Sequence, residues 1–350
     1  MRRGHRATLT AAVAVVSLLG LAGPAAACGA LLGADGTIEL GRTTTLSAYT
    51  DGVQRYVTAF EFTGEGEEVG SIVPLPDVPT DVERGGDWTL QRLALEVAPP
   101  VREELAFDVD DAAEAASAEV LLETEVDALD LTVLRGGADE VGRWASDNGF
   151  FLSPDAPEML DFYAGRSEIF LAARFDASRA DDLGQQVGTS TPIMLTIPTD
   201  RPWVPLRILS LGAEASQVVE ADVFLLTDHE PQLLAGGDGL ELDRSEPASR
   251  ALLDDLRADE GMGWLPHDMW LTYLRLDTPA GDLDYDLAIS TDPEVRPTLA
   301  DAGVLTAASG PPVVPGDGPA RWPWALGLAG GVLVIGAALL SRRARQEESA

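Results

Sequence analysis

The stretch LDLTVLRGGADEVGRWASDN, residues 129–148, contains a strand pattern followed at once by a helix pattern. Leu129–Leu134 is rich in apolar residues and reads as a strand. Two glycines at 136–137 interrupt the pattern. From Asp139 to Asn148, apolar residues then share one side of a helix: Val141, Trp144 and Ala145. A strand joined to a helix by a short glycine turn predicts a fold that mixes both elements.

Strand patterns dominate on both sides of this stretch. Further strands are predicted at Thr37–Leu46, Val53–Phe62, Val69–Leu75, Ile169–Phe175, Ile193–Ile197, Leu206–Leu211, Val218–Leu226, Met269–Leu276 and Leu283–Ile289. Helices are predicted at Trp88–Val97, with Asp87 as its cap, near Pro157–Tyr163 and at Ala248–Arg257. Because strands outnumber helices and no regular strand–helix–strand alternation occurs, the sequence predicts an α+β fold with mainly antiparallel sheet.

One internal stretch departs from these patterns. Residues 108–127, DVDDAAEAASAEVLLETEVD, are acidic and rich in alanine, which is typical of an exposed helix or a disordered loop. The large region 28–306 is expected to form one domain. A division into two subdomains, if there is one, is expected near 108–128.

The N-terminus has the three parts of a secretory signal peptide. Arginines at the start precede the apolar run Leu9–Leu21, and the small residues Ala25–Ala27 form a cleavage site. Residues 1–27 are therefore predicted to be a cleaved signal peptide, and the alternative is an uncleaved membrane anchor. Cys28, the single cysteine, follows the cleavage site directly. It is a candidate for lipidation, or else a small packed residue of the mature chain.

The C-terminal region predicts a membrane anchor. Residues 322–340, WPWALGLAGGVLVIGAALL, carry no charge and are long enough to cross the hydrocarbon core as one helix, Trp322–Leu340. Arginines follow in the predicted cytoplasmic tail 341–350, so region 28–306 is expected outside the membrane. Residues 307–321 are rich in proline and glycine and read as a stalk. Gly327 and Gly331 have the GxxxG spacing that lets two such helices pair in a homodimer.

The charge balance excludes one class of partner. The chain has 58 acidic residues against 24 basic ones and a formal net charge of −34. Such a surface repels nucleic acid and anionic lipid, and it attracts cations or basic partners. The alternative interpretation is that the acid-rich composition reflects genome usage or a salty habitat.

Few residues are candidates for chemistry. Only two histidines, His229 and His267, lie outside the signal peptide, and no serine lies in a nucleophile-elbow motif. Asp282, Asp284 and Asp286 alternate along a predicted strand and are weak candidates for calcium, or else an acidic solvent-facing strand. No other cofactor is predicted.

An aromatic residue between two prolines is the candidate for ligand stacking. Trp203 lies in the sequence RPWVP, residues 201–205. Its ring is expected either to stack on a ligand or to pack at the edge of a strand.

Several stretches in fixed order carry a resemblance to a known family. They are Ala27–Gly29, IVPLPDVP at 72–79, TVLRGGADEVGRWASDNGF at 132–150, LDFYAGRSEIFLAARFD at 160–176 and TPIMLTIPTDRPWVPLRIL at 191–209. Over residues 27–290 the chain resembles the bacterial domain-of-unknown-function family 2330. The resemblance implies export to the bacterial cell membrane, often with a C-terminal membrane helix, and brings no established activity. Some members have a second cysteine soon after the first, which this chain lacks.

Together these observations predict a single-pass extracytoplasmic protein that binds or organises an envelope or surface component without catalysis. One alternative is an extracytoplasmic hydrolase that uses paired carboxylates. The other is a structural domain stabilised by calcium.

Overall fold

The computed structural model describes residues 30–33, 39–40, 42–59, 62–63, 68–98, 120–185, 190–235 and 237–304. All of them belong to one compact unit, residues 1–306. Several predicted segments lie outside the described residues: the signal peptide 1–27, Cys28, the first part of the acidic stretch 108–127, the stalk 307–321, the membrane helix 322–340 and the tail 341–350. Among the described residues, no helix is both long and apolar enough to span a bilayer.

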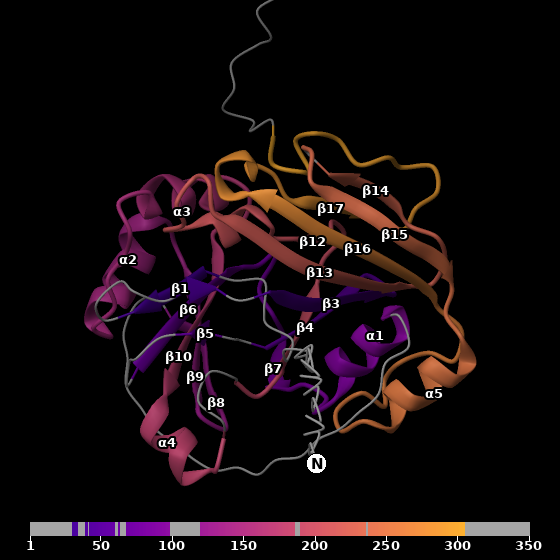
Figure 1. Ribbon diagram of the computed structural model, residues 1–350, viewed down its shortest axis with the longest axis horizontal. Coiled ribbons are helices and arrows are strands. Elements are labelled where there is room, and N and C mark those ends of the chain that lie inside the picture. The colour runs from indigo at the N-terminus through magenta and orange to yellow at the C-terminus, as the bar shows by residue number, and fades with distance from the viewer. Residues whose placement is uncertain are drawn as a thin grey trace, which may run out of the picture. The chain divides into compact units, whose positions relative to one another are not determined.

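Two large sheets and two small ones make up the strands of the described residues (Figure 1). The five-stranded sheet has the order β1 (Ala30–Gly33), β6 (Glu68–Pro74), β10 (Ile169–Asp176), β9 (Leu129–Arg135) and β8 (Val120–Val126). The seven-stranded sheet has the order β15 (Leu240–Pro247), β16 (Trp270–Pro279), β13 (Val218–Thr227), β3 (Thr43–Thr50), β4 (Val53–Thr58), β11 (Ile193–Pro198) and β7 (Asp81–Arg84). The small sheets are β12 (Trp203–Val204), β17 (Leu287–Ser290) and β14 (Gln232–Ala235), and β2 (Glu39–Leu40) with β5 (Phe62–Thr63).

Five α-helices and two 3-10 turns accompany the described strands. They are α1 (Thr89–Val97), α2 (Ala138–Asp147), α3 (Ala156–Ala164), α4 (Ala177–Asp182), α5 (Arg250–Ala258), η1 (Arg207–Ser210) and η2 (Ala280–Asp282). Described strand pairs are antiparallel except β3 with β13, which run parallel. The predicted α+β class with mainly antiparallel sheet is therefore confirmed.

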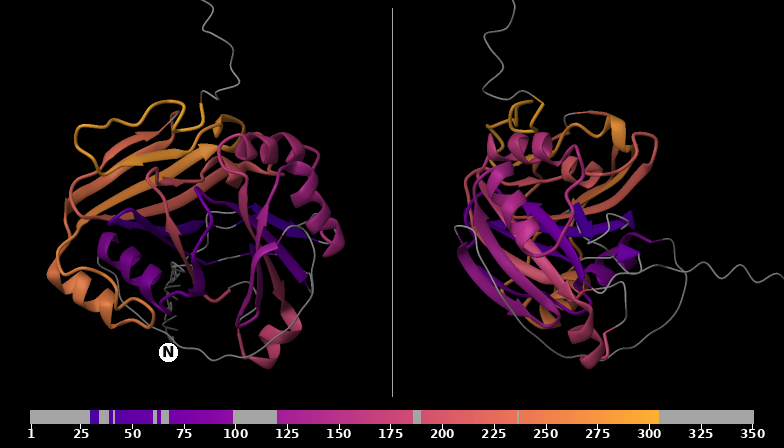
Figure 2. Two further views of the ribbon diagram at one scale, coloured as in Figure 1. Left: turned by 180° about the vertical axis from the view of Figure 1, so that it is seen from behind. Right: turned by 90° about the vertical axis from the view of Figure 1, so that its left-hand side faces the viewer.

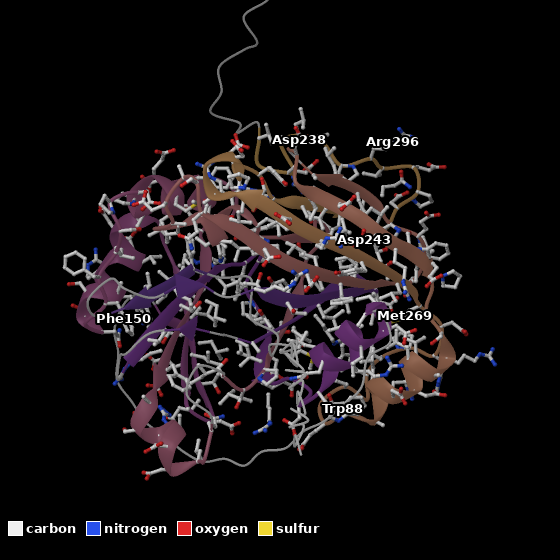
Figure 3. The ribbon with its side chains drawn as sticks, in the orientation of Figure 1. Trp88, Phe150, Asp238, Asp243, Met269 and Arg296 are labelled. Atoms are coloured by element: carbon white, nitrogen blue, oxygen red, sulfur yellow. The ribbon has the colours of Figure 1, made fainter. Side chains whose placement is uncertain are left out.

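The main core lies between the two large sheets and under α2 and α3. One continuous apolar cluster contains buried side chains from both sheets and from these two helices. On the helical side of the five-stranded sheet, Phe150 packs over Gly70 of β6, beside β1 (Figure 3). A Cβ at Gly70 would come within 2.8 Å of the phenyl ring, so only glycine leaves room for it.

A second core lies on the other face of the seven-stranded sheet, where α1 and α5 lie side by side (Figures 1 and 2). Every residue of β3 is buried, because this strand is central and both of its faces are covered. Leu46 and Ala48 belong to the core under the helices. Thr45 and Ser47 alternate onto the opposite face, towards the five-stranded sheet.

The N-terminus of α1 is capped from a distant part of the chain. The carboxylate of Asp259, which follows α5, accepts hydrogen bonds from the backbone N–H groups of Asp87 and Trp88, both at 3.1 Å. It also accepts the hydroxyl of Thr89 at 2.7 Å. The predicted cap, Asp87, instead forms a surface ion pair with Arg84. The prediction of the helix is confirmed, and that of its cap is wrong because the cap comes from 170 residues further along.

Three predicted elements are corrected. The apolar stretch Leu206–Leu211 is not a strand, because a 3-10 turn, η1, occupies Arg207–Ser210. Within the acidic stretch 108–127 the described part, from residue 120, forms the edge strand β8 and not a helix or loop. The predicted strand Leu283–Ile289 is shorter than expected, since β17 begins only at Leu287.

Candidate functional site

Asp286 is a fully buried carboxylate just before β17. Its Oδ1 accepts the hydroxyl of Tyr163 at 2.8 Å and the backbone N–H groups of Leu206 and Arg207 at 2.7 and 3.0 Å. Its Oδ2 pairs with the guanidinium of Arg166. Four donors around one carboxylate satisfy a charge that burial alone would make very costly. We call Asp286, Tyr163 and Arg166 the buried carboxylate site.

Three separate segments bring these groups together. Tyr163 lies on the buried face of α3 with Ala156, Met159 and Leu160, which recur at helical spacing. Arg166 follows the end of that helix. The start of η1 presents backbone N–H groups that have no partner within so short a turn, and these donors suit an anion. The site therefore fastens α3, η1 and the approach to β17 to one another.

Aromatic rings surround the arginine of the site. Trp203 stacks on Tyr163 with ring centroids 5.8 Å apart, and the guanidinium carbon of Arg166 lies 4.2 Å from the centroid of Trp203. Phe162 packs edge-on against Tyr163, and the guanidinium carbon of Arg207 lies 4.2 Å from the centroid of the Phe162 ring. Guanidinium groups over aromatic faces gain cation–π attraction, which is stronger when water is excluded. These rings shield the ion pair from solvent.

Burial dominates the protonation behaviour of the site. It raises the pKa of Asp286, although Arg166, the Tyr163 hydroxyl and the two backbone N–H groups act in the opposite direction. Burial and the neighbouring carboxylate also raise the pKa of Tyr163 well above its ordinary value. The phenol therefore stays protonated at neutral pH and remains a donor to Asp286. It also accepts the backbone N–H of Ile208 at 2.9 Å.

A capped helical turn near the end of the described chain packs on this site. We call residues Thr298–Val304 the C-terminal strap. The guanidinium of Arg166 donates to the carbonyl of Asp301, and the backbone N–H of Asp286 donates to the carbonyl of Ala302 at 2.9 Å. Ala302 is fully buried. The site thus holds the last described residues before the predicted stalk.

The predicted calcium candidates are not brought together. Asp282 belongs to η2 and Asp284 to the irregular segment after it, and both are exposed. Asp286 points into the interior, where Arg166 neutralises it. Among the described residues, no group of three or more histidine, cysteine, aspartate or glutamate side chains is arranged to hold a metal ion.

The other predicted residues are found in ordinary surroundings. Trp203 lies in β12 and is only 6% exposed, so stacking on a ligand would require its present contacts to open. His229 is exposed, with Nε2 2.5 Å from the carbonyl of Thr291. His267 is exposed, 4.0 Å from Asp254. Cys28, Gly327 and Gly331 lie outside the described residues.

Sequence reasoning missed Tyr163, Arg166 and Asp301 as parts of this site. The signal that points to it is the placement of Asp286 inside the apolar run YDLAI, residues 285–289. An acid in such a run is rarely buried without a paired or hydrogen-bonded partner. The partners themselves are 120 or more residues away for Tyr163 and Arg166, so no local pattern identifies them.

Comparison with known proteins gives a family and distant structural likenesses. A family model described as an uncharacterized protein conserved in bacteria (DUF2330) matches residues 22–234. No curated protein matches the chain. Among solved structures, baculovirus P35 is similar at 10% identity and a TM-score of 0.38, covering 73% of this chain and 97% of that one. A mutated baculovirus P35 after caspase cleavage is similar at 8% identity and a TM-score of 0.36, covering 73% of this chain and 99% of that one.

Proposed function

The chain belongs to the DUF2330 family of uncharacterized bacterial proteins, and we propose that it is a membrane-anchored, noncatalytic binding or envelope-organising module. The predicted signal peptide and the uncharged stretch Trp322–Leu340 support a position outside the bacterial cell membrane, with the tail in the cytoplasm. Pairing through Gly327 and Gly331 would bring two such anchors together.

One observation carries the noncatalytic part of the proposal. The buried carboxylate of Asp286 is saturated by four donors, and Arg166, its charged partner, also holds the carbonyl of Asp301. A general acid or base needs a free position within reach of substrate. These groups use their hydrogen-bonding capacity to fasten the domain to the segment that leads towards the predicted anchor. A holding role fits this arrangement.

The charge of the chain suggests the chemistry of the partner. With a net charge of −34, the protein attracts cationic surfaces and repels polyanions. We therefore expect an envelope or surface component that presents basic groups, and we expect its association rate to fall as ionic strength rises.

Protease protection tests the location. The full-length chain with a C-terminal epitope tag is expressed in a bacterium, and external protease is added to spheroplasts. We expect digestion of region 28–306, protection of the tag and resistance of the fragment to alkaline extraction. The control is Val334→Arg with Ile335→Arg, because two charges at the centre of the segment oppose insertion. A full-length chain in the cytosol with its first residues intact would overturn the proposal.

Cross-linking in intact cells tests the binding role. The anchored chain and the Val334→Arg, Ile335→Arg control are compared by quantitative mass spectrometry after cross-linking. We expect the anchored chain to enrich a specific basic envelope component, and high salt during binding to weaken the enrichment. Robust turnover of a substrate by the purified full-length chain, without a stable partner, would contradict a noncatalytic role.

A further inference from the structure

The C-terminal strap has its own internal architecture. At its start, the carboxylate of Asp301 accepts the backbone N–H and hydroxyl of Thr298 at 2.7 and 2.6 Å, and Thr298 Oγ1 accepts the N–H of Asp301 at 3.3 Å. This reciprocal pair is a capping box. Burial acts to raise the pKa of Asp301, but its hydrogen bonds with Thr298 and the charges of Arg201 and Arg166 together lower it. The first turn therefore carries its own N-terminal cap.

The C-terminal end of the strap is capped as well. The N–H of Val304 donates to the carbonyl of Leu299 at 2.9 Å, and the N–H of Gly303 donates to that of Ala300 at 3.1 Å. Gly303 has φ +79°, the left-handed conformation that this C-terminal capping motif requires. Seven residues thus carry both an N-terminal and a C-terminal cap. The hydrogen bonds of both caps are therefore made within the strap itself.

Side chains and backbone groups around the buried carboxylate site hold this turn in place. Its seat includes the side chains of Phe162 and Arg166 and the backbone N–H of Asp286. Of the strap's apolar side chains Ala302 is fully buried, whereas Leu299 and Val304 are 42% and 36% exposed. A segment with little buried apolar area opens at low cost compared with the core.

The connection to the domain leaves the strap room to move. Residues 292–296 are all exposed, and Figure 3 shows Arg296 among them at the periphery. Seven residues, 291–297, separate the end of β17 from Thr298, and an extended chain of that length reaches roughly 23–25 Å. Exchange of such a segment between identical chains is a low-cost route to association, because every contact already exists within one chain.

We propose that the C-terminal strap is a releasable ligand of its own domain, and that the seat accepts the same turn from a second copy of the chain. The carbonyls of Asp301 and Ala302, the buried side chain of Ala302 and the close approach of Gly303 are the features that the seat would recognise. A neighbouring copy supplies this turn unchanged. The inference deepens the binding role proposed above and rests on it for its setting at the membrane.

Gly303→Ala tests whether the strap is releasable, in the full-length chain in detergent micelles. A Cβ there would lie 2.6 Å from Phe162 Cζ and would strain the left-handed backbone. Gly52→Ala is the matched control, because Gly52 has φ +76° and nothing within 4 Å of the added Cβ. Hydrogen exchange at the Asp286 amide is expected to speed up at least about tenfold in Gly303→Ala and to stay unchanged in Gly52→Ala.

A synthetic peptide, PTLADAGV, corresponding to residues 297–304, tests whether the seat accepts the turn from outside. We expect saturable binding to the Gly303→Ala chain, half-complete at or below about 1 mM, the effective concentration at which a short tether holds the strap. The wild-type chain, whose seat is filled, is expected not to bind. A peptide with alanine in place of its glycine serves as the control and is expected not to bind either chain.

Two outcomes overturn the proposal. Unchanged exchange at Asp286 in Gly303→Ala would show that the strap does not leave its seat. Faster exchange without peptide binding would show that the seat does not take the turn from a second copy. If Gly303→Ala fails to fold, Thr298→Ala with Asp301→Ala loosens the same turn without a clash. Both measurements use purified chain, so neither depends on the location or partner proposed above.

Discussion

A largely buried guanidinium such as that of Arg166, whose side chain is 11% exposed, is costly unless a carboxylate accompanies it, and here the carboxylate is that of Asp286. The pair also organises the neutral groups around it. Without the carboxylate, the hydroxyl of Tyr163 and two backbone N–H groups would lose their acceptor inside the protein. Removing the carboxylate of Asp286 therefore costs more stability than its own bonds contribute, because its partners stay inside the protein without an acceptor.

Asp286→Ala is expected to lower the free energy of unfolding by about 3–5 kcal/mol, because it leaves the largely buried charge of Arg166 without a carboxylate. Asp284→Ala, two residues away and exposed, is expected to change it by less than about 0.5 kcal/mol. Urea unfolding followed by circular dichroism measures both. Equal effects of the two substitutions would contradict the assignment of Asp286 as the centre of the site.

The ionisation of Tyr273 is expected to lower the stability of the fold at alkaline pH. Burial, the hydrogen bond to Asp222 and the charge of that carboxylate raise its pKa to about 12. A tyrosine in the unfolded chain ionises near pH 10, so the folded state holds the proton more tightly. The resulting stability is fully present below about pH 10 and is lost as pH rises towards 12. In denaturant titrations from pH 9 to 12, Tyr273→Phe should show a shallower loss than wild type, and parallel curves would refute this.

At the scale of elements, the strength of the local pattern decided which predictions succeeded. The predicted stretch Leu129–Asn148 folds as β9 and α2, because one alternates and the other buries a single face. The strand β15 was missed because its mostly exposed, polar residues carry no apolar alternation. The prediction of a strand at Leu206–Leu211 was wrong because a short apolar run suits a strand or a 3-10 turn equally. There Asp286, 80 residues away, binds the N–H of Leu206 and favours the turn.

The remote cap of α1 gives a contrast between two aspartates. Asp259→Ala is expected to destabilise the protein by about 1–2 kcal/mol, because two backbone N–H groups and the hydroxyl of Thr89 lose their acceptor. Asp87→Ala removes only an exposed ion pair with Arg84 and should cost less than about 1 kcal/mol. Thermal melts of both variants decide between a local and a remote cap. A larger loss of stability in Asp87→Ala than in Asp259→Ala would show that Asp87 is the cap of α1.

Two glycines inside elements should respond with opposite signs. In α2, a Cβ at Gly142 meets its nearest neighbour, Leu152, at an ordinary 3.5 Å, so Gly142→Ala should stabilise by about 0.5–1 kcal/mol. In β6, Gly70→Ala collides with Phe150 and should destabilise by about 1–3 kcal/mol. Differential scanning calorimetry measures both shifts. A gain in stability for Gly70→Ala would show that the ring above it moves aside freely.

At the scale of the whole molecule, charge opposes compactness. The net charge of −34 repels itself, and salt screens that repulsion. The melting temperature should therefore rise as sodium chloride increases from low to physiological concentration. A constant or falling temperature would show that attractive pairs outweigh the repulsion. Calcium chloride compared with magnesium chloride at the same concentration tests the calcium alternative, because both divalent ions screen charge alike and a specific calcium site would raise the temperature further only with calcium.

The candidate site illustrates what composition and spacing leave undetermined. The sequence drew attention to Asp286 and Trp203 separately, for calcium and for stacking. The fold brings both to Tyr163 and Arg166, which lie on or after a helix predicted only for its apolar face. Which distant groups meet is decided by sheet order and core packing, and those are set by the whole chain.

If the apolar segment is an anchor, any load on the outer domain passes through the strap before it reaches the core. Rupture under force would then begin at the hydrogen bond between the carbonyl of Ala302 and the backbone N–H of Asp286, which the load reaches before the bond between Arg166 and the carbonyl of Asp301. Release of the strap would lengthen the connection to the anchor by several residues while the sheets stay folded. This lengthening limits the force on the folded part.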